Sequence, residues 1–168
     1  MTSKRDDFTN LLQSHVRIIY KIVNSYCKKE HAKKDLEQEI VLQLWASFER
    51  YDQQYKFSTW MYRVALNTAI SFYRKNLKQK ERYYDRDYTS IISIEDEESV
   101  SEKEAQLNLL QQFINDLDPL NKAIMLLYLD EKSHQEIADI IGISKSNVGT
   151  KIGRIKIKLK SEFKKHLQ

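Results

Sequence analysis

The chain has 168 residues, which is enough for one ordinary domain or two small ones. Three glycines and one proline favour long helices over a turn-rich β fold, and the single cysteine, Cys27, excludes an internal disulfide and fits a reducing cytoplasm. The net charge of +4 is unevenly spread: residues 1–89 carry +6, residues 90–118 carry −7 and residues 119–168 carry +5. Two basic blocks around an acidic connector favour a nucleic-acid partner, although charged faces that only keep helices in solution would give a similar balance.

Apolar residues recur at helical spacing through the first basic block. Their pattern predicts one amphipathic helix over residues 7–27 and a second that starts at Asp35, which is suited to cap it, and runs to about residue 48. Residues 49–56 break the pattern and indicate a loop. A third long helix is expected from Ser58 to about residue 80.

Aromatic residues gather in and just after that loop, beside basic neighbours. Unpaired bases stack on such rings, at roughly 1–3 kcal/mol per base, which would suit single-stranded DNA. Rings at helical spacing are equally typical of a protein core. We expect Trp60 to be mostly packed and Tyr51 and Tyr55 to be exposed.

Residues 85–103 have the acidic, apolar-poor composition of an extended linker between domains at residues 1–84 and 104–168. The overall expectation is an all-α protein of two small helical domains. The N-terminal segment has no unbroken apolar run, so neither a signal peptide nor a membrane span is expected. The four histidines lack ligand spacing, which predicts no metal site. No cofactor is expected either.

Residues 133–148 carry the strongest local signal, that of a helix-turn-helix. Ser133 and Glu136 form a capping-box pattern, and Gly142 suits the left-handed position after a helix. Ser144 can cap the next helix, and Val148 would face the core. This motif places a short helix in a DNA major groove, although a helical hairpin without DNA contact would share part of the pattern.

The face opposite Val148 offers small polar groups and one arginine, which suit base edges because arginine binds guanine and asparagine binds adenine. Neighbouring lysines would meet phosphates. The expected DNA-binding residues here are Lys145, Ser146, Asn147, Thr150, Lys151 and Arg154. Gly149 and Gly153 are unusual inside a helix, and either a close approach of DNA or a weakly formed helix would account for them.

Taken together, residues 35–45, 57–67 and 117–159 resemble three parts of the bacterial RNA polymerase sigma factors of the extracytoplasmic-function (ECF) group. The resemblance implies a non-enzymatic, cytoplasmic transcription initiation factor that directs core polymerase to promoters. Its implied partners are the β′ clamp coiled coil, the β flap, promoter DNA and an anti-sigma factor.

The resemblance also assigns roles to residues of the first block. The helix-turn-helix would read the minus-thirty-five element, and the aromatic loop would capture a base of the minus-ten element. The implied polymerase-binding residues are Asp35, Gln38, Glu39, Gln43 and Trp45. The implied minus-ten and melting residues are Tyr51, Asp52, Gln53, Tyr55, Lys56, Phe57, Trp60, Arg63, Asn67 and Arg74.

Two other functions are compatible with parts of the pattern. A stand-alone helix-turn-helix regulator would bind a palindromic duplex as a dimer, but the aromatic and basic first block argues against it. A DNA recombinase would need grouped carboxylates for metal, or a nucleophilic serine or tyrosine with an arginine cluster. The acids of this chain instead lie on expected helix faces or in the linker.

Overall fold

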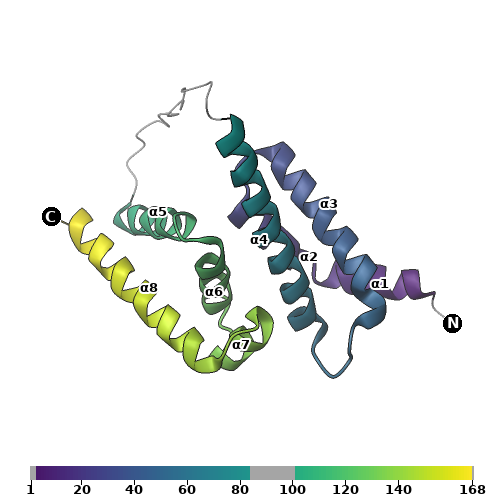
Figure 1. Cartoon of the computed structure of the whole chain (residues 1–168). Helices are drawn as coiled ribbons and strands as arrows, with labels where there is room; N and C mark the ends of the chain where they lie inside the picture. The colour runs from purple at the N-terminus through teal and green to yellow at the C-terminus, as the bar shows by residue number, and fades with distance from the viewer. Residues whose placement is uncertain (1–2, 84–100, 168) are drawn as a thin grey trace.

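The computed structural model describes residues 3–83 and 101–167, and every regular element within them is helical (Figure 1). The all-α expectation is therefore confirmed. The elements in chain order are α1 (Lys4–Ser14), α2 (Val16–Tyr26), α3 (Glu30–Ser47), the short 3₁₀ helix η1 (Phe48–Arg50), α4 (Phe57–Tyr83), α5 (Glu102–Asn115), α6 (Pro119–Leu129), α7 (His134–Ile141) and α8 (Lys145–His166).

The single helix expected over residues 7–27 is wrong, because the chain breaks at His15 into α1 and α2. The break coincides with side chains that bond to the last carbonyls of α1. The Ser14 hydroxyl donates to Asn10 O at 2.7 Å, and His15 Nδ1 lies 2.9 Å from Leu11 O. Serine and similar residues compete for backbone carbonyls in this way and favour helix ends.

The first domain is built on α2, α3 and α4. Helix α3 begins at Glu30, five residues earlier than expected, so Asp35 is an exposed residue inside the helix and not its cap. Leu36, Ile40 and Leu44 recur every four residues and are fully buried. Together with apolar residues of α2 and α4 they form the core of this domain.

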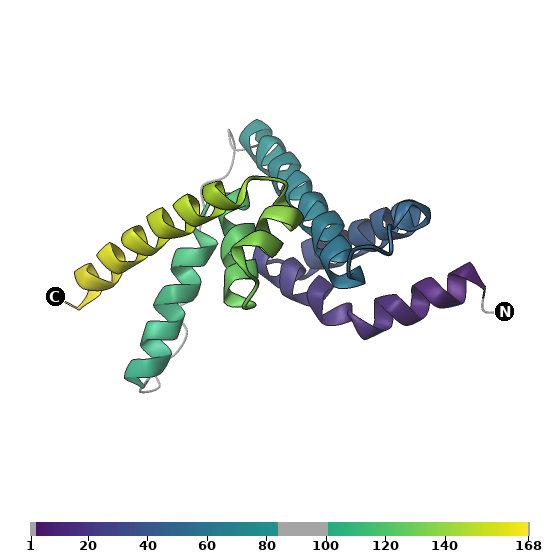
Figure 2. The ribbon, with the colours of Figure 1, turned by 90° about the horizontal axis from the view of Figure 1, so that it is seen from below.

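The second domain consists of α5 to α8. A small core of its own, with Phe113, Met125 and Ile155, joins α5, α6 and α8. In the view of Figure 2, α5 and α8 project separately on the side away from the first domain. Residues 102 and 103 belong to α5, so the expected linker is two residues too long at that end, and residues 85–100 of it lie outside the described residues.

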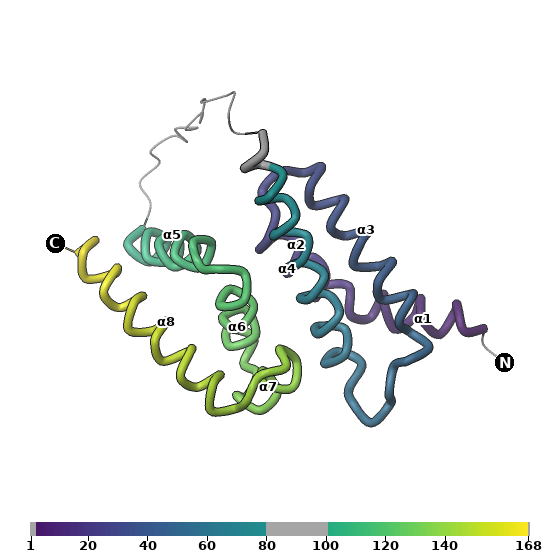
Figure 3. The backbone as a smooth tube through the Cα atoms, in the orientation of Figure 1, coloured from purple at the N-terminus to yellow at the C-terminus, as the bar shows by residue number. Residues whose placement is uncertain are grey.

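The two domains pack against each other. Helices α6 and α7 lie along α4 in the backbone trace (Figure 3), and buried residues of α4, α6 and α7 belong to one continuous apolar core. Because the apolar core runs through the interface, it holds the two domains in one arrangement more firmly than a polar contact would.

Candidate nucleic-acid interface

Helices α7 and α8 form a helix-turn-helix whose turn is fixed by local hydrogen bonds. The Ser133 hydroxyl accepts the Glu136 amide at 3.1 Å, and the Ser133 amide donates to the Glu136 carboxylate at 2.7 Å. The bond from the Ser133 amide to this carboxylate, and then the Ser133 hydroxyl, hold the pKa of the Glu136 carboxyl below its ordinary value. Gly142 has a φ of +83°, and Ser144 caps α8 by accepting the Asn147 amide at 3.1 Å. The expected motif is confirmed.

Helix α8 turns one face inward and leaves the other in solvent. Val148, Ile152 and Ile155 are buried against the rest of the second domain. Lys151 is half-buried, and the other five residues expected to contact DNA are exposed: Lys145, Ser146, Asn147, Thr150 and Arg154. This face therefore offers hydroxyl, amide and guanidinium groups that can reach base edges, with cations beside them for phosphates.

The loop after η1 is supported by an aromatic cluster. Phe57 packs with the rings of Tyr51 and Trp60 at centroid distances of 5.5 and 5.3 Å, and it is buried. The Phe57 ring thus supports the loop from below in this structure, and its contact with a separated strand stays a prediction. Tyr51 is half-buried, contrary to expectation, and its hydroxyl donates to Tyr55 O at 2.7 Å. Tyr55 itself is 50% exposed.

The other polar residues of the loop, Asp52, Gln53 and Lys56, are exposed. The Asp52 carboxylate accepts the Gln54 amide at 3.0 Å, which gives the loop a local turn. A groove of about 810 Å³ lies between this loop and α1. The loop thus presents one free ring and several polar groups on an aromatic base.

Three exposed residues of α4 expected near the separated strand share one face. Arg63, Asn67 and Arg74 are spaced by four and seven residues, which brings them onto one side of a helix. Asn67 lines a groove of about 660 Å³ between α3 and α4. The Arg63 guanidinium donates to the backbone oxygen of Asp139 in α7, so the second domain already occupies this end of the face.

Helix α3 presents the residues expected to bind polymerase. Asp35, Gln38 and Gln43 are exposed and Glu39 is half-buried. Trp45 is 41% exposed and packs its ring edge-to-face on Phe8 of α1, with centroids 5.1 Å apart. Sequence reasoning missed Leu42, which is 60% exposed; its position on an otherwise polar face, between Glu39 and Trp45, was the available signal.

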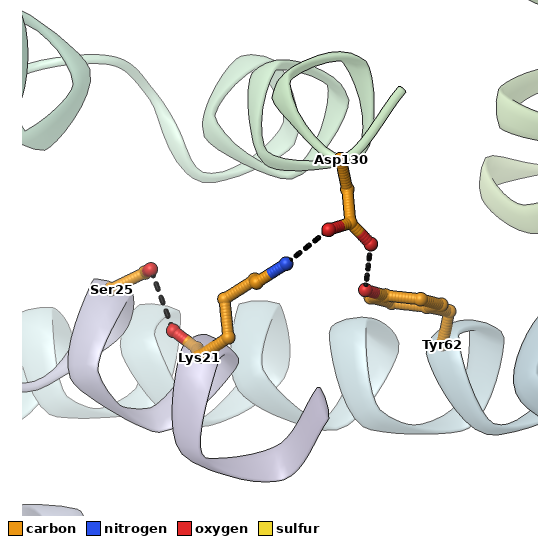
Figure 4. A network of polar contacts seen from close by, with 4 residues as sticks. All are labelled: Lys21, Ser25, Tyr62 and Asp130. Carbon is orange, nitrogen blue, oxygen red and sulfur yellow. Dashed lines mark hydrogen bonds and ion pairs between the residues drawn. The ribbon is translucent and has the colours of Figure 1, made fainter. Parts of the chain in front are cut away.

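Sequence reasoning also missed the polar contacts between the domains. Asp130, the C-cap of α6, accepts hydrogen bonds from the Lys21 ammonium and the Tyr62 hydroxyl (Figure 4). Burial raises the pKa of the Asp130 carboxyl, but these two donors and the nearby cations outweigh it, so that pKa lies below its ordinary value. Burial and the Asp130 contact raise the pKa of the Tyr62 hydroxyl. No local sequence signal identifies these residues, because the partners lie 68 to 109 positions apart.

Two further observations concern the described residues only. Nowhere in residues 3–83 and 101–167 do three or more His, Cys, Asp or Glu side chains come together as metal ligands would. Within the same ranges, none of the helices combines the length and hydropathy needed to cross a membrane.

The fold and the exposed face of α8 define a two-domain helical protein with a helix-turn-helix DNA-binding module. Comparisons with known proteins narrow this class. The model of sigma-70 region 2 matches residues 11–79, and that of sigma-70 region 4 matches residues 107–159. The chain therefore belongs to the sigma-70 family of transcription initiation factors, in its ECF group.

Relatives match over nearly the whole chain. ECF RNA polymerase sigma factor SigW of Bacillus subtilis (strain 168) is 27% identical over 95% of this chain and 90% of its own, and SigM of the same organism is 25% identical over 91% and 93%. Among solved structures, sigma factor RpoE in complex with the anti-sigma factor NepR, from Bartonella quintana, has a TM-score of 0.69 at 18% identity, over 94% of this chain and 97% of that one. CnrH in complex with the cytosolic domain of CnrY has a TM-score of 0.66 at 19% identity, over 96% and 90%.

Proposed function

We propose that this chain binds core RNA polymerase in the cytoplasm and directs it to promoters that it reads at two separate elements. The observation that carries the proposal is that one chain combines an exposed helix-turn-helix face in its second domain with an aromatic loop and a polar helix face in its first domain. The chain would supply recognition, and the polymerase would supply the chemistry. Division of the chain into domains at 1–84 and 104–168 is supported by the two family matches, which fall one on each side.

In this proposal α8 lies in the major groove of the minus-thirty-five element. Base edges would be contacted by Ser146, Asn147, Thr150 and Arg154. Phosphates would be contacted by Lys145 and Lys151. The β flap of the polymerase would hold the second domain there.

Run-off transcription with purified core polymerase on duplex promoter fragments tests this role. Polymerase with the chain should start at discrete sites. Arg154→Ala should reduce discrimination at the upstream element by about 1–3 kcal/mol for each lost base contact, roughly 5- to 150-fold. Lys164→Ala is the matched control, because it removes one exposed cation from the last turn of the same helix. Promoter selection by the free chain as sharp as that with polymerase would instead support the stand-alone regulator.

The minus-ten element would be bound by the loop and by α4. Tyr55 offers the exposed ring, and its backbone oxygen accepts the hydroxyl of Tyr51, whose ring packs on Trp60. The other polar residues around it in the loop are Asp52, Gln53 and Lys56. Arg63, Asn67 and Arg74 would follow the separated strand. Tyr55→Ala should reduce the stability of the open complex by about 1–3 kcal/mol, the value of one stacked base. Tyr20→Ala is the control, since Tyr20 on α2 is 49% exposed and Tyr55 is 50% exposed.

Polymerase would dock on α3 through Asp35, Gln38, Glu39, Gln43 and Trp45, against the β′ clamp coiled coil. The combined variant Gln38→Ala and Glu39→Ala should weaken polymerase binding and leave the helical content unchanged. Glu30→Ala, an exposed change in the first turn of the same helix, should leave binding intact. We also propose an anti-sigma factor as a partner, because the similar structure of RpoE is a complex with the anti-sigma factor NepR, and that of CnrH is a complex with the cytosolic domain of CnrY.

A further inference from the structure

One ring of α1 lies between the two surfaces of the first domain that the proposed function assigns to different partners. Within α1, which the structure describes completely, Phe8 is the buried residue, at 6% exposed. Its ring makes edge-to-face contacts with Trp45 of α3 and with Phe48 of η1, and in both pairs the centroids are 5.1 Å apart and the planes 64° from parallel. Aromatic pairs of this geometry stabilise a structure beyond the area that they bury.

On the side of the polymerase surface, α1 fixes the indole of Trp45. That side chain is 41% exposed, and an exposed side chain loses rotamer freedom when a partner binds it. Phe8 packs against the indole on one side, and Lys4 Nζ lies 5.4 Å from its centroid. The indole is therefore held in one orientation before any partner binds, which lowers the entropy cost of binding.

On the side of the loop, Phe8 supports the aromatic base beneath the minus-ten residues. Phe48 is the first residue of η1, and its ring stacks with that of Tyr51 at a centroid distance of 6.5 Å and packs on Trp60 at 6.2 Å. The Tyr51 hydroxyl donates to Tyr55 O at 2.7 Å, so the stack reaches the residue that offers the exposed ring. Contacts thus run from Phe8 through Phe48 and Tyr51 to Tyr55.

Helix α1 is tied to the same region at two more points. The Lys4 ammonium pairs with the Glu49 carboxylate of η1. At the other end, the ring of His15, which follows α1, lies 5.1 Å from that of Phe57. Of these contacts, those of Phe8 alone join a ring of the polymerase surface to a ring of the loop.

We propose that Phe8 is a positioning residue for promoter opening, because one buried ring holds both Trp45 for core polymerase and the loop for the separated strand. The roles of Trp45 and of the loop rest on the proposed function. Lys4 assists Phe8 from the surface, since it contacts both Trp45 and Glu49. Phe8 itself is covered by the chain, so it acts on both partners only through its neighbours.

The test uses the full chain with Phe8→Leu, which keeps a large apolar side chain and removes the ring. Leu12→Ala is the matched control: Leu12 lies one turn later in α1, is half-buried and packs on the core of the domain, outside the aromatic contacts described above. Urea unfolding of both variants measures the stability that each change costs. The binding assays are run where both variants are fully folded.

Two measurements report the two surfaces separately. Competition with a labelled wild-type chain gives the affinity for core polymerase. The lifetime of open complexes, on a fragment from which the wild-type chain starts transcription and with polymerase saturated by the chain, gives the hold on the strand alone. We expect Phe8→Leu to lower both by about two- to ten-fold, the range of one aromatic pair, and Leu12→Ala to lower neither.

The variants already described for the two surfaces serve as references. Gln38→Ala with Glu39→Ala should lower only the affinity for polymerase, and Tyr55→Ala only the lifetime of the open complex. A change at Phe8 should therefore combine two defects that changes at the surfaces themselves give one at a time.

The emission of Trp45 connects these effects to the ring. In a Trp60→Phe background, Phe8→Leu should shift that emission to the red in the free chain, and Leu12→Ala should not. If Phe8→Leu loses helical circular dichroism, Lys4→Gln replaces it. This exposed change should lower both the polymerase affinity and the open-complex lifetime by about two-fold.

The proposal is overturned if Phe8→Leu leaves either measure unchanged, or if Leu12→Ala lowers both measures equally. A wild-type chain that fails to bind core polymerase would refute the proposed function instead. The shift in Trp45 emission needs no polymerase, so it would still report whether Phe8 holds the indole.

Discussion

Replacing Gly153 by alanine should make the protein more stable and a poorer reader of promoters. Gly153 lies inside α8, and a Cβ built there meets nothing within 4 Å. Alanine is favoured over glycine in a helix interior by about 0.8–1 kcal/mol, and no clash offsets that gain here. For a chain of this size the gain corresponds to a rise in Tm of about 2–4 °C.

The open space at Gly153 also means that packing within the chain does not require a glycine. Gly153 follows Ser146 and Thr150 by seven and three residues, so it lies on the exposed reading face of α8. A methyl group would therefore stand between the helix and the floor of the major groove. We expect a loss of affinity for the upstream element, measured with core polymerase on duplex fragments that carry or lack it.

Gly149→Ala is the matched control for both effects. A Cβ at Gly149 would lie on the side of α7, in ordinary contact with His134 Nδ1 at 3.6 Å. Alanine at this position therefore gives the same gain in helix stability without placing a methyl group on the reading face. A fall in Tm for Gly153→Ala would refute the stability argument. Equal promoter affinity in the two variants would refute the explanation by close approach of DNA.

Three further changes test other parts of the structure. Ser133→Ala removes the hydroxyl that accepts the Glu136 amide and should lower the free energy of unfolding by about 1 kcal/mol in urea; an unchanged value would mean that the cap is not formed in solution. Phe8→Ala should cost about 3–5 kcal/mol and shift the fluorescence of Trp45 to the red in a Trp60→Phe background, since the Phe8 ring covers that indole; an unshifted spectrum would argue against the α1–α3 contact. The pKa of Asp130 is lowered when the two domains are packed together. Its contribution to the stability of the interface is therefore present above the ordinary carboxyl pKa of about 3.9 and is lost as the pH falls below it. The interdomain distance should therefore stay constant from neutral pH to about pH 5 and lengthen below pH 4, an effect absent in Asp130→Asn.

The helix-turn-helix could be predicted from the sequence because each of its signals is local. Ser133, Glu136, Gly142 and Ser144 act within a few residues of themselves, and the structure confirms each of them. Other helix ends were harder to predict from the sequence. The apolar pattern continues through His15, so periodicity alone predicted one helix where the chain forms two.

Which rings of the aromatic loop are exposed depends on contacts between different elements, and the sequence does not show these contacts. Phe57 and Tyr51 differ little from Tyr55 as residue types near a loop. Phe57 is nevertheless buried, because it packs against His15 and Phe48, which belong to different elements of the first domain. Lys122 and Asp130 present the same difficulty: both have the sequence character of surface residues of a helix, and only the packing of the second domain on α2 and α4 gives them partners.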